Sequence, residues 1–203
     1  MKIYIVNGSG DYNRLFLSLG MSLTADLNEA DMVCFTGGED VSPSYYGDGK
    51  HKYTGNNPYR DAKEAQIFEQ CLDKGVPCVG ICRGAQFLNV MSGGRMYQHV
   101  EKHCGNHVIT DLETGETVYV SSTHHQMMMP SPEGLLVASS TLGGSREWYE
   151  GEVFKRDVSD EDIEVVFYEH TKCLCFQPHP EFSSAEYEGM KDYFARCVVK
   201  YLH

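Results

Sequence analysis

The chain has 203 residues, 41% hydrophobic and 23% charged, with a formal net charge of −12 at pH 7. This length and composition predict one globular domain over residues 1–203 with a substantial core. The negative charge, with Lys and Arg scattered along the chain, argues against nucleic-acid binding. No window is long enough to span a membrane, and the N-terminal apolar stretch is too short for a signal peptide, so we expect no membrane association and a cytoplasmic location.

The first half of the chain alternates predicted strands and helices. β-branched and apolar runs that end in turn residues predict the strands, and apolar side chains on one helical face predict the helices. A loop rich in Gly, Pro and Asn over 39–59 interrupts this alternation. The elements expected are strands at 2–6, 21–25, 31–38 and 76–81 and helices at 12–19, 61–74 and 84–91.

The second half is rich in predicted strands. The segment 107–120 alternates like a hairpin, and a closing helix is expected from about Ala185. Further strands are expected at 134–139, 147–154, 163–168 and 173–177. Together, the two halves predict an α/β fold: an open, mostly parallel sheet with helices on both faces and an antiparallel extension.

The eight cysteines do not suggest a disulfide framework. Cys34, Cys78, Cys173 and Cys175 lie in apolar, strand-like runs, which is typical of reduced core cysteines in a cytosolic protein.

Cys82 stands apart because Gly80 and Gly84 flank it where a predicted strand meets a predicted helix. This layout resembles the nucleophile elbow of serine hydrolases, with sulfur in place of oxygen. Glycine at both positions removes the side chains that would collide in so tight a turn. At a helix N-terminus, free N–H groups and the helix dipole favour the thiolate. The alternative is a core cysteine beside glycines that serve close packing.

A candidate base follows the last predicted strand. Pro180 biases His179 toward an extended conformation, in which residues two apart project to the same side. Glu181 can then orient the imidazole and leave its other nitrogen free for a thiol. Cys82, His179 and Glu181 are therefore the candidate nucleophile, base and orienting carboxylate. For the histidine segment alone, a solvated loop is the alternative.

Paired glycines at Gly37 and Gly38 end the predicted strand at 31–38. Their backbone N–H groups could approach a substrate carbonyl and form an oxyanion hole together with the N–H of Arg83. A simple tight turn is the alternative interpretation.

A second cluster could bind zinc if its segment were helical. It consists of His99, His103, Cys104 and His107. Gly105 interrupts such a helix and no second half-site is evident, so a polar loop near the active site is favoured and no metal is expected.

Motifs in a fixed order then identify a resemblance. They are G-G-x-D-x-x-P-x-x-Y-G from Gly37, R-D-x-x-E from Arg60, G-I-C-R-G-x-Q from Gly80, G-G-x-x-Y-Q from Gly93, S-x-H-H-Q from Ser122 and Q-P-H-P-E from Gln177. In these motifs the sequence resembles the class I glutamine amidotransferase-like superfamily, and most closely its γ-glutamyl-γ-aminobutyrate hydrolase branch.

The resemblance implies a flavodoxin-like sheet, a Cys-His-Glu triad at Cys82, His179 and Glu181, and a γ-glutamyl thioester intermediate. It implies oxyanion donors at Gly38 and Arg83 and no metal or organic cofactor. The substrate-binding residues that it implies are Gly37, Gln86, His125 and Gln126.

The expected substrate is a small γ-glutamyl compound, either glutamine or a γ-glutamyl amine. The protein would be a free-standing hydrolase or a glutaminase subunit that delivers ammonia to a separate synthetase subunit. A third possibility, from a different class, is a non-catalytic module that keeps the fold and binds a γ-glutamyl compound.

Overall fold

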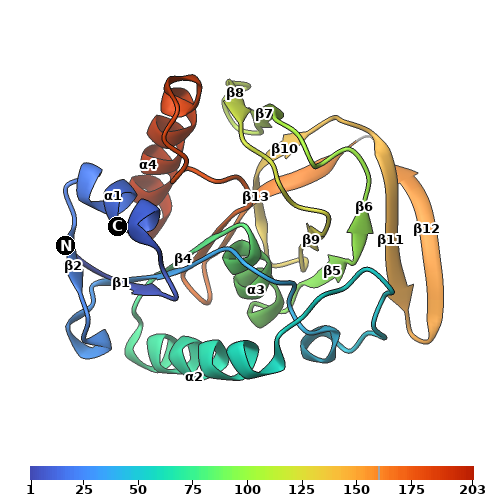
Figure 1. Cartoon of the computed structure of the whole chain (residues 1–203), viewed down its shortest axis with the longest axis horizontal. Helices are drawn as coiled ribbons and strands as arrows, with labels where there is room; N and C mark the ends of the chain where they lie inside the picture. The colour runs from blue at the N-terminus through green and yellow to red at the C-terminus, as the bar shows by residue number, and fades with distance from the viewer. Residues whose placement is uncertain (160) are drawn as a thin grey trace.

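A large mixed sheet runs through the centre of the computed structural model, which describes residues 1–159 and 161–203 (Figure 1). From β2 to β14 the neighbouring strands are parallel, and from β14 to β8 they are antiparallel. This confirms the predicted sheet and its extension. In spatial order the strands are β2 (Ser22–Thr24), β1 (Lys2–Val6), β3 (Met32–Phe35), β4 (Cys78–Ile81), β14 (Cys173–Phe176), β13 (Asp162–Tyr168), β10 (Leu135–Ser140), β7 (His107–Asp111) and β8 (Thr117–Val120).

Helices cover both faces of the parallel part, as predicted (Figure 1). Strand β14 shows how one strand serves both faces, because successive side chains alternate. Leu174 and Phe176 belong to the apolar cluster that contains α1 and α4, whereas Cys173 and Cys175 belong to the cluster of α2 and α3. The helices are α1 (Gly10–Ser18), α2 (Pro58–Lys74), α3 (Arg83–Met91) and α4 (Glu188–Leu202), and the short 3₁₀ helices are η1 (Leu27–Glu29), η2 (Pro43–Tyr46) and η3 (Ala185–Tyr187).

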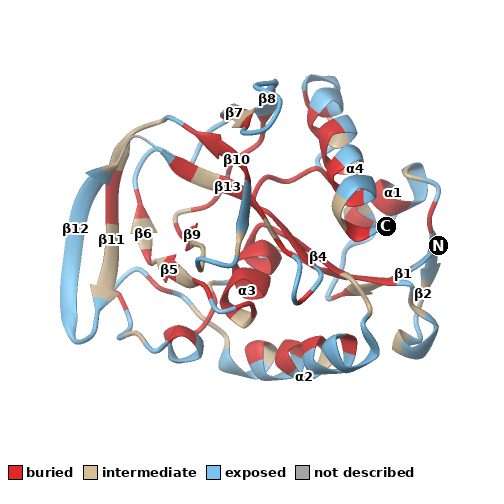
Figure 2. Ribbon diagram, turned by 180° about the vertical axis from the view of Figure 1, so that it is seen from behind, coloured by how far each residue is buried: buried red, intermediate tan, exposed pale blue. Residues whose placement is uncertain are grey.

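Two smaller sheets flank the antiparallel end (Figure 2). The strand expected at 147–154 is wrong: Gly151, at φ +63°, turns the chain, so the segment is a hairpin rather than one strand. Its second strand, β12, is exposed along almost its whole length (Figure 2). Three further strands were not predicted because two or three residues give no periodic signal. The small-sheet strands are β5 (Arg95–Tyr97), β6 (His99–Val100), β9 (Met127–Met129), β11 (Gly144–Glu150) and β12 (Val153–Ser159).

The other predictions need only small changes. The predicted hairpin is β7–β8, α1 begins at Gly10 rather than at 12, and η3 precedes α4. The cysteines expected in the core are buried and free. In the described residues, no helix has the length and apolar character needed to cross a membrane.

The turn from β4 to α3 leaves no space for side chains beside the backbone. A Cβ atom on Gly80 would lie 2.3 Å from the carbonyl oxygen of Gly84, and one on Gly84 would lie 2.0 Å from the carbonyl oxygen of Phe35. Both contacts are with backbone, which cannot move aside as a flexible side chain can. Helix α3, buried along nearly all its length, can therefore pack directly against β3 and β4 (Figure 2).

We predict opposite effects from alanine at two helical glycines. Gly84→Ala should lower the free energy of unfolding by about 1–3 kcal/mol, because its methyl group collides with strand β3. Gly189→Ala, in α4, is the matched control: nothing lies within 4 Å of its Cβ position. It should leave stability unchanged or raise it by up to about 1 kcal/mol through helix propensity. Urea unfolding measures both, and equal effects would contradict the packing explanation.

Candidate active site

The carboxyl ends of three adjacent parallel strands bring the candidate residues together. Gly37 and Gly38 follow β3, Cys82 follows β4, and His179 follows β14. In open α/β sheets this edge is where ligands bind.

Cys82 occupies a backbone conformation that non-glycine residues rarely adopt, with φ 53° and ψ −113°. Its N–H donates to the carbonyl oxygen of Phe176 on β14, at 3.0 Å, which fixes the turn to the sheet. The residue is 9% exposed and lines a cavity of about 180 Å³. Cys82 therefore lies at the start of α3 where the apolar core meets a confined cavity. Strain of this kind is commonly found at functional sites.

His179 is held on several sides. Its Nδ1 lies 2.7 Å from Oε1 of Glu181, and its backbone N–H donates to the hydroxyl of Ser121 at 3.1 Å. The ring of Phe182 stacks on the imidazole, with 4.6 Å between ring centroids and 5° between planes. The imidazole is therefore fixed by a carboxylate, a backbone anchor and an aromatic surface.

The second ring nitrogen of His179 lies beside Thr123. Its Nε2 lies 2.9 Å from Oγ1 of Thr123, a partner that the sequence did not indicate. Burial by itself would lower the pKa of His179, but hydrogen bonds with Cys82 and Glu181 raise that pKa to about 10. This environment favours the imidazolium between a sulfur and a carboxylate.

The paired glycines differ in what their N–H groups do. The N–H of Gly37 donates to the Tyr12 hydroxyl at 2.9 Å, so it is already used. In the described part of the chain, the N–H of Gly38 has no protein acceptor, and Gly38 lines the cavity. Arg83 is the first residue of α3, where backbone N–H groups have no acceptor within the helix. Gly38 and Arg83 therefore each have a backbone N–H available as a donor near Cys82.

The cavity contains most of the predicted site residues and adds three that were not predicted. Gly37 and Glu181 are not in its lining: Gly37 is engaged with Tyr12, and Glu181 contacts Nδ1 of His179. No sequence pattern indicates Thr123, and Asp40 and His124 enter the sequence analysis only as letters of the motifs. The lining residues are Gly38, Asp40, Cys82, Arg83, Gln86, Thr123, His124, His125, Gln126 and His179.

The two predicted substrate-binding glutamines mainly build the cavity wall. The side-chain amide of Gln86 donates to the carbonyl of Gln126 and to Oε1 of Gln177, each at 3.1 Å. The amide of Gln126 donates to Oγ1 of Thr54, also at 3.1 Å. The carbonyl of His125 accepts from the Val100 N–H at 2.8 Å. The backbone groups left for a ligand here are therefore N–H donors.

Asp40 brings a carboxylate into the cavity. Its Oδ1 lies 3.1 Å from Nε2 of His125, and this hydrogen bond raises the pKa of that histidine. The pair brings a carboxylate and an imidazole to this side of the cavity.

The four residues considered for zinc do not converge. His99 stacks against His51 and Tyr53, with ring centroids 5.8 and 4.8 Å apart. His103 and His107 instead point into a buried cluster around Glu164. Over the described residues, no group of three or more His, Cys, Asp or Glu side chains is arranged to hold a metal ion.

Glu164 and the histidines around it form a buried cluster behind the cavity wall. Nε2 of His107 lies 3.0 Å from the Glu164 carboxylate, and Nε2 of His124 lies 3.6 Å from it. Burial would raise the pKa of Glu164, but His124 and His107 hold it well below its usual range. Because His124 also lines the cavity, this charge cluster supports one wall of the site.

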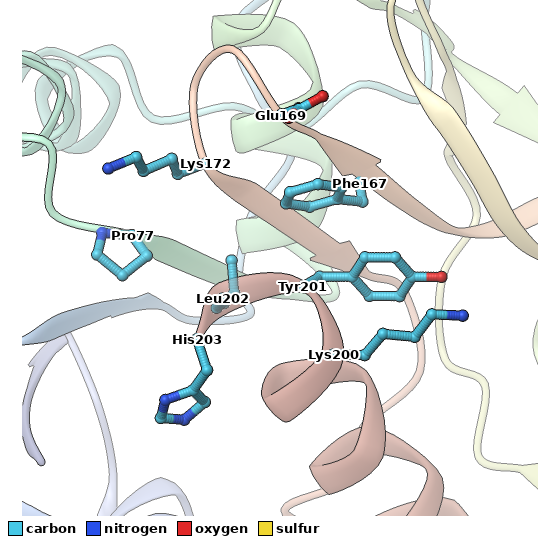
Figure 3. A pocket seen from close by; sticks show the side chains of 8 residues that line it. All are labelled: Pro77, Phe167, Glu169, Lys172, Lys200, Tyr201, Leu202 and His203. Carbon is cyan, nitrogen blue, oxygen red and sulfur yellow. The ribbon is translucent and has the colours of Figure 1, made fainter.

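A second, larger cavity of about 430 Å³ lies at the opposite edge of the sheet (Figure 3). Pro77 precedes β4 and Lys172 precedes β14, so both mark the amino ends of the strands. Leu202 and His203 close the cavity from the end of α4. Within the described residues, its lining includes no cysteine, and it lies away from the Cys82 edge.

Comparison with known proteins identifies the family of the chain. The sequence pattern of the peptidase C26 family matches residues 16–181. A Mycobacterium tuberculosis protein, provisionally named a glutamine amidotransferase, is 34% identical over 138 residues, which cover 58% of this chain and 45% of that protein. The matched part is thus less than half the length of this curated relative.

Solved structures of low sequence identity share the fold. A glutamine amidotransferase of Thermotoga maritima superposes with a TM-score of 0.64 at 15% identity, over 98% of this chain and 84% of that one. PurLQS of the same organism gives a TM-score of 0.63 at 18% identity, over 100% and 98%. The chain therefore belongs to the peptidase C26 family of glutamine amidotransferase-like proteins.

Proposed function

We propose that this chain is a cysteine amidohydrolase that cleaves the γ-amide bond of glutamine or of a γ-glutamyl amine. One observation carries the proposal: Cys82 and His179 line the same confined cavity, and Nδ1 of His179 lies 2.7 Å from Oε1 of Glu181. Membership of the peptidase C26 family supports a hydrolase. The substrate is the part of the proposal that the family does not specify.

Acylation begins with the Cys82 thiolate. Its sulfur forms a bond to the γ-carbonyl carbon, and the carbonyl π electrons move to oxygen. The N–H groups of Gly38 and Arg83 stabilise this oxyanion. His179 then protonates the amide nitrogen, the C–N bond breaks, and the amine or ammonia leaves a γ-glutamyl thioester. Glu181 stabilises the imidazolium from which the proton comes.

Deacylation repeats these roles with water. Neutral His179 takes a proton from water, whose oxygen attacks the thioester carbonyl. The same two N–H groups stabilise the second oxyanion. The C–S bond breaks, glutamate leaves, and the thiolate–imidazolium pair is restored.

A glutaminase subunit that passes ammonia to a separate synthetase is the second candidate. The likeness to PurLQS favours it, because there the same fold occurs in a named assembly. The two candidates differ in what the purified chain does alone. Turnover of γ-glutamyl amines without a partner supports the free-standing hydrolase, whereas a low glutaminase rate that a synthetase stimulates supports the subunit.

We predict that Cys82→Ala abolishes release of the amine from γ-glutamyl amides while the thermal unfolding midpoint stays close to that of wild type. The reason is that Cys82 lies at the edge of the core, beside a cavity, and alanine removes only one sulfur atom there. Cys104→Ala is the matched control, because Cys104 is also free but is exposed and lies outside the cavity.

Amine release by Cys82→Ala would refute the assignment. A γ-glutamyl diazoketone separates the third possibility: it should label Cys82 at neutral pH. A thiol that stays unlabelled would indicate a binding module instead.

We also predict a shifted pH profile for Glu181→Gln. Glu181 raises the pKa of His179, so its loss lowers that pKa from about 10. The alkaline limb of kcat/KM, where His179 loses the proton that the leaving group needs, should therefore move to lower pH. The rate at neutral pH should fall by about a hundredfold.

The control for this variant is Glu186→Gln, an exposed acid nearby in the chain. Its pH profile should match that of wild type. An alkaline limb that stays in place in Glu181→Gln would show that Glu181 does not act on the imidazole.

A further inference from the structure

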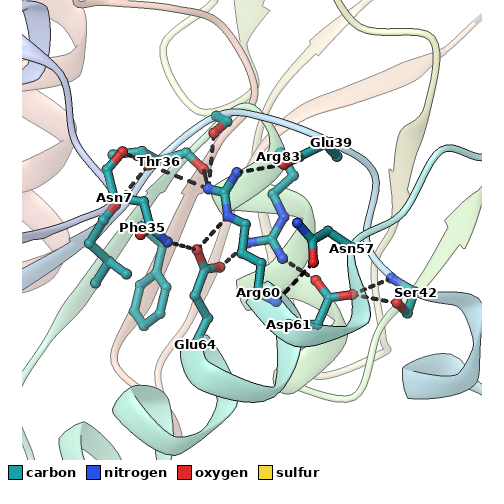
Figure 4. A network of polar contacts seen from close by, with 12 residues as sticks. Asn7, Phe35, Thr36, Glu39, Ser42, Asn57, Arg60, Asp61, Glu64 and Arg83 are labelled. Atoms are coloured by element: carbon teal, nitrogen blue, oxygen red, sulfur yellow. Dashed lines mark hydrogen bonds and ion pairs between the residues drawn. The ribbon is translucent and has the colours of Figure 1, made fainter.

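The start of helix α2 carries charged residues that the proposed reaction has not used. Arg60, Asp61 and Glu64 form the R-D-x-x-E motif, and Figure 4 shows them beneath the cavity loops. The side chain of Asn57 caps the helix by accepting from the Arg60 N–H at 3.2 Å. A spacing of four residues then places Arg60 and Glu64 on one face, where Nε of Arg60 donates to Glu64 at 2.7 Å.

The motif anchors Arg83, the residue that follows the candidate nucleophile. The Arg83 guanidinium is buried and pairs with Asp61 and with Glu64. The backbone N–H of Arg83 is one of the proposed oxyanion donors. Its side chain therefore ties the first turn of α3 to α2, and Glu64 is shared, with one carboxylate oxygen for each arginine.

Arg60 contacts the peptide that carries the other proposed donor, the N–H of Gly38. Nη2 of Arg60 donates to the carbonyl oxygen of Gly37 at 3.0 Å and to that of Thr36 at 3.1 Å. The Gly37 carbonyl and the Gly38 N–H belong to one trans peptide, so they point in opposite directions. A guanidinium that holds the carbonyl toward α2 thus turns the N–H away from α2.

The surroundings of the two glycines agree with this orientation. A Cβ atom on Gly38 would lie 2.0 Å from Nη1 of Arg60, whereas one on Gly37 would lie 3.3 Å from the His179 ring and 3.7 Å from Cβ of Cys82. Arg60 therefore lies on one side of this loop and the candidate catalytic groups on the other. Gly38 also has φ +146°, a conformation that other residues rarely adopt.

We propose that Arg60 is a positioning residue that holds the Gly37–Gly38 peptide with its N–H directed at the oxyanion. This inference rests on the proposed function. The hydrogen bond from a charged group also polarises the peptide and strengthens its N–H as a donor. Asp61 and Glu64 bind the side chain of Arg83. Residues of helix α2 therefore contact both segments that carry the proposed oxyanion donors.

The test compares two reactions of the Cys82 thiol in a Cys104→Ala background. Iodoacetamide alkylates the thiolate without forming an oxyanion. The probe 5-oxopentanoate carries an aldehyde at the γ-carbonyl position and lacks the α-amine with which it could cyclise. Addition of the thiolate to the aldehyde forms a C–S bond and moves the carbonyl π electrons to oxygen. The proposed oxyanion hole would stabilise this oxyanion. Protection of Cys82 from alkylation gives the aldehyde affinity.

Arg60→Met should weaken aldehyde binding about tenfold or more, while the alkylation rate without aldehyde stays within about twofold of wild type. Arg60→Lys keeps the charge but lacks the planar guanidinium, which bonds the two carbonyls through Nη2 and Glu64 through Nε at once, so its affinity should be intermediate. This variant also serves if Arg60→Met fails to fold. Lys63→Met, an exposed cation of the same helix, is the control and should bind the aldehyde like wild type.

Steady-state kinetics on a γ-glutamyl amide should agree, with kcat reduced in Arg60→Met and KM nearly unchanged. Aldehyde affinity at the wild-type value in both Arg60 variants would overturn the inference. A wild-type Cys82 that iodoacetamide does not alkylate would instead overturn the proposed function, and with it the inference.

Discussion

The site depends on how tightly the backbone turns between β4 and α3. No Cβ atom fits at Gly80 or Gly84, because backbone atoms occupy both places. The helix consequently begins directly at the strand end, and Cys82 is held at a positive φ with its N–H bonded to β14. Cys82 then lies where the core meets the cavity at the strand ends. A looser turn would permit a relaxed backbone at Cys82 and move the sulfur away from His179.

Around this turn, buried charges hold the loops that the sheet brings together. Arg60 and Arg83 share the carboxylates of α2 below the cavity, and histidines surround Glu164 behind its wall. Buried ion pairs contribute little net stability, because desolvation offsets much of their attraction, but losing one partner is costly. Their value here is geometric. Each network connects segments far apart in the sequence, so a displaced loop would leave a buried charge without its partner.

Much of this arrangement could be predicted from local patterns. The parallel sheet follows from alternating apolar strands and amphipathic helices, and the closeness of His179 and Glu181 follows from an extended Pro-bounded segment. The roles of these residues stay predictions. Thr123 and Asp40 were missed as cavity residues because only the long-range register of loops brings them to the cavity. Gly151 lies inside the segment predicted as one strand, yet its positive φ makes a hairpin. Gln86 and Gln126 line the cavity, but their amides are already bonded within its wall, so their role toward a substrate stays a prediction.

Acid quenching of the purified chain during turnover of a γ-glutamyl amide, followed by mass spectrometry of its peptides, tests most directly whether Cys82 is the acyl acceptor. The peptide that carries Cys82 should gain the mass of one glutamyl group, and hydroxylamine, which cleaves thioesters, should remove it. Turnover with the glutamyl group on another cysteine, or with none on Cys82 under conditions where deacylation limits the rate, would contradict the assignment of this thiol as the nucleophile.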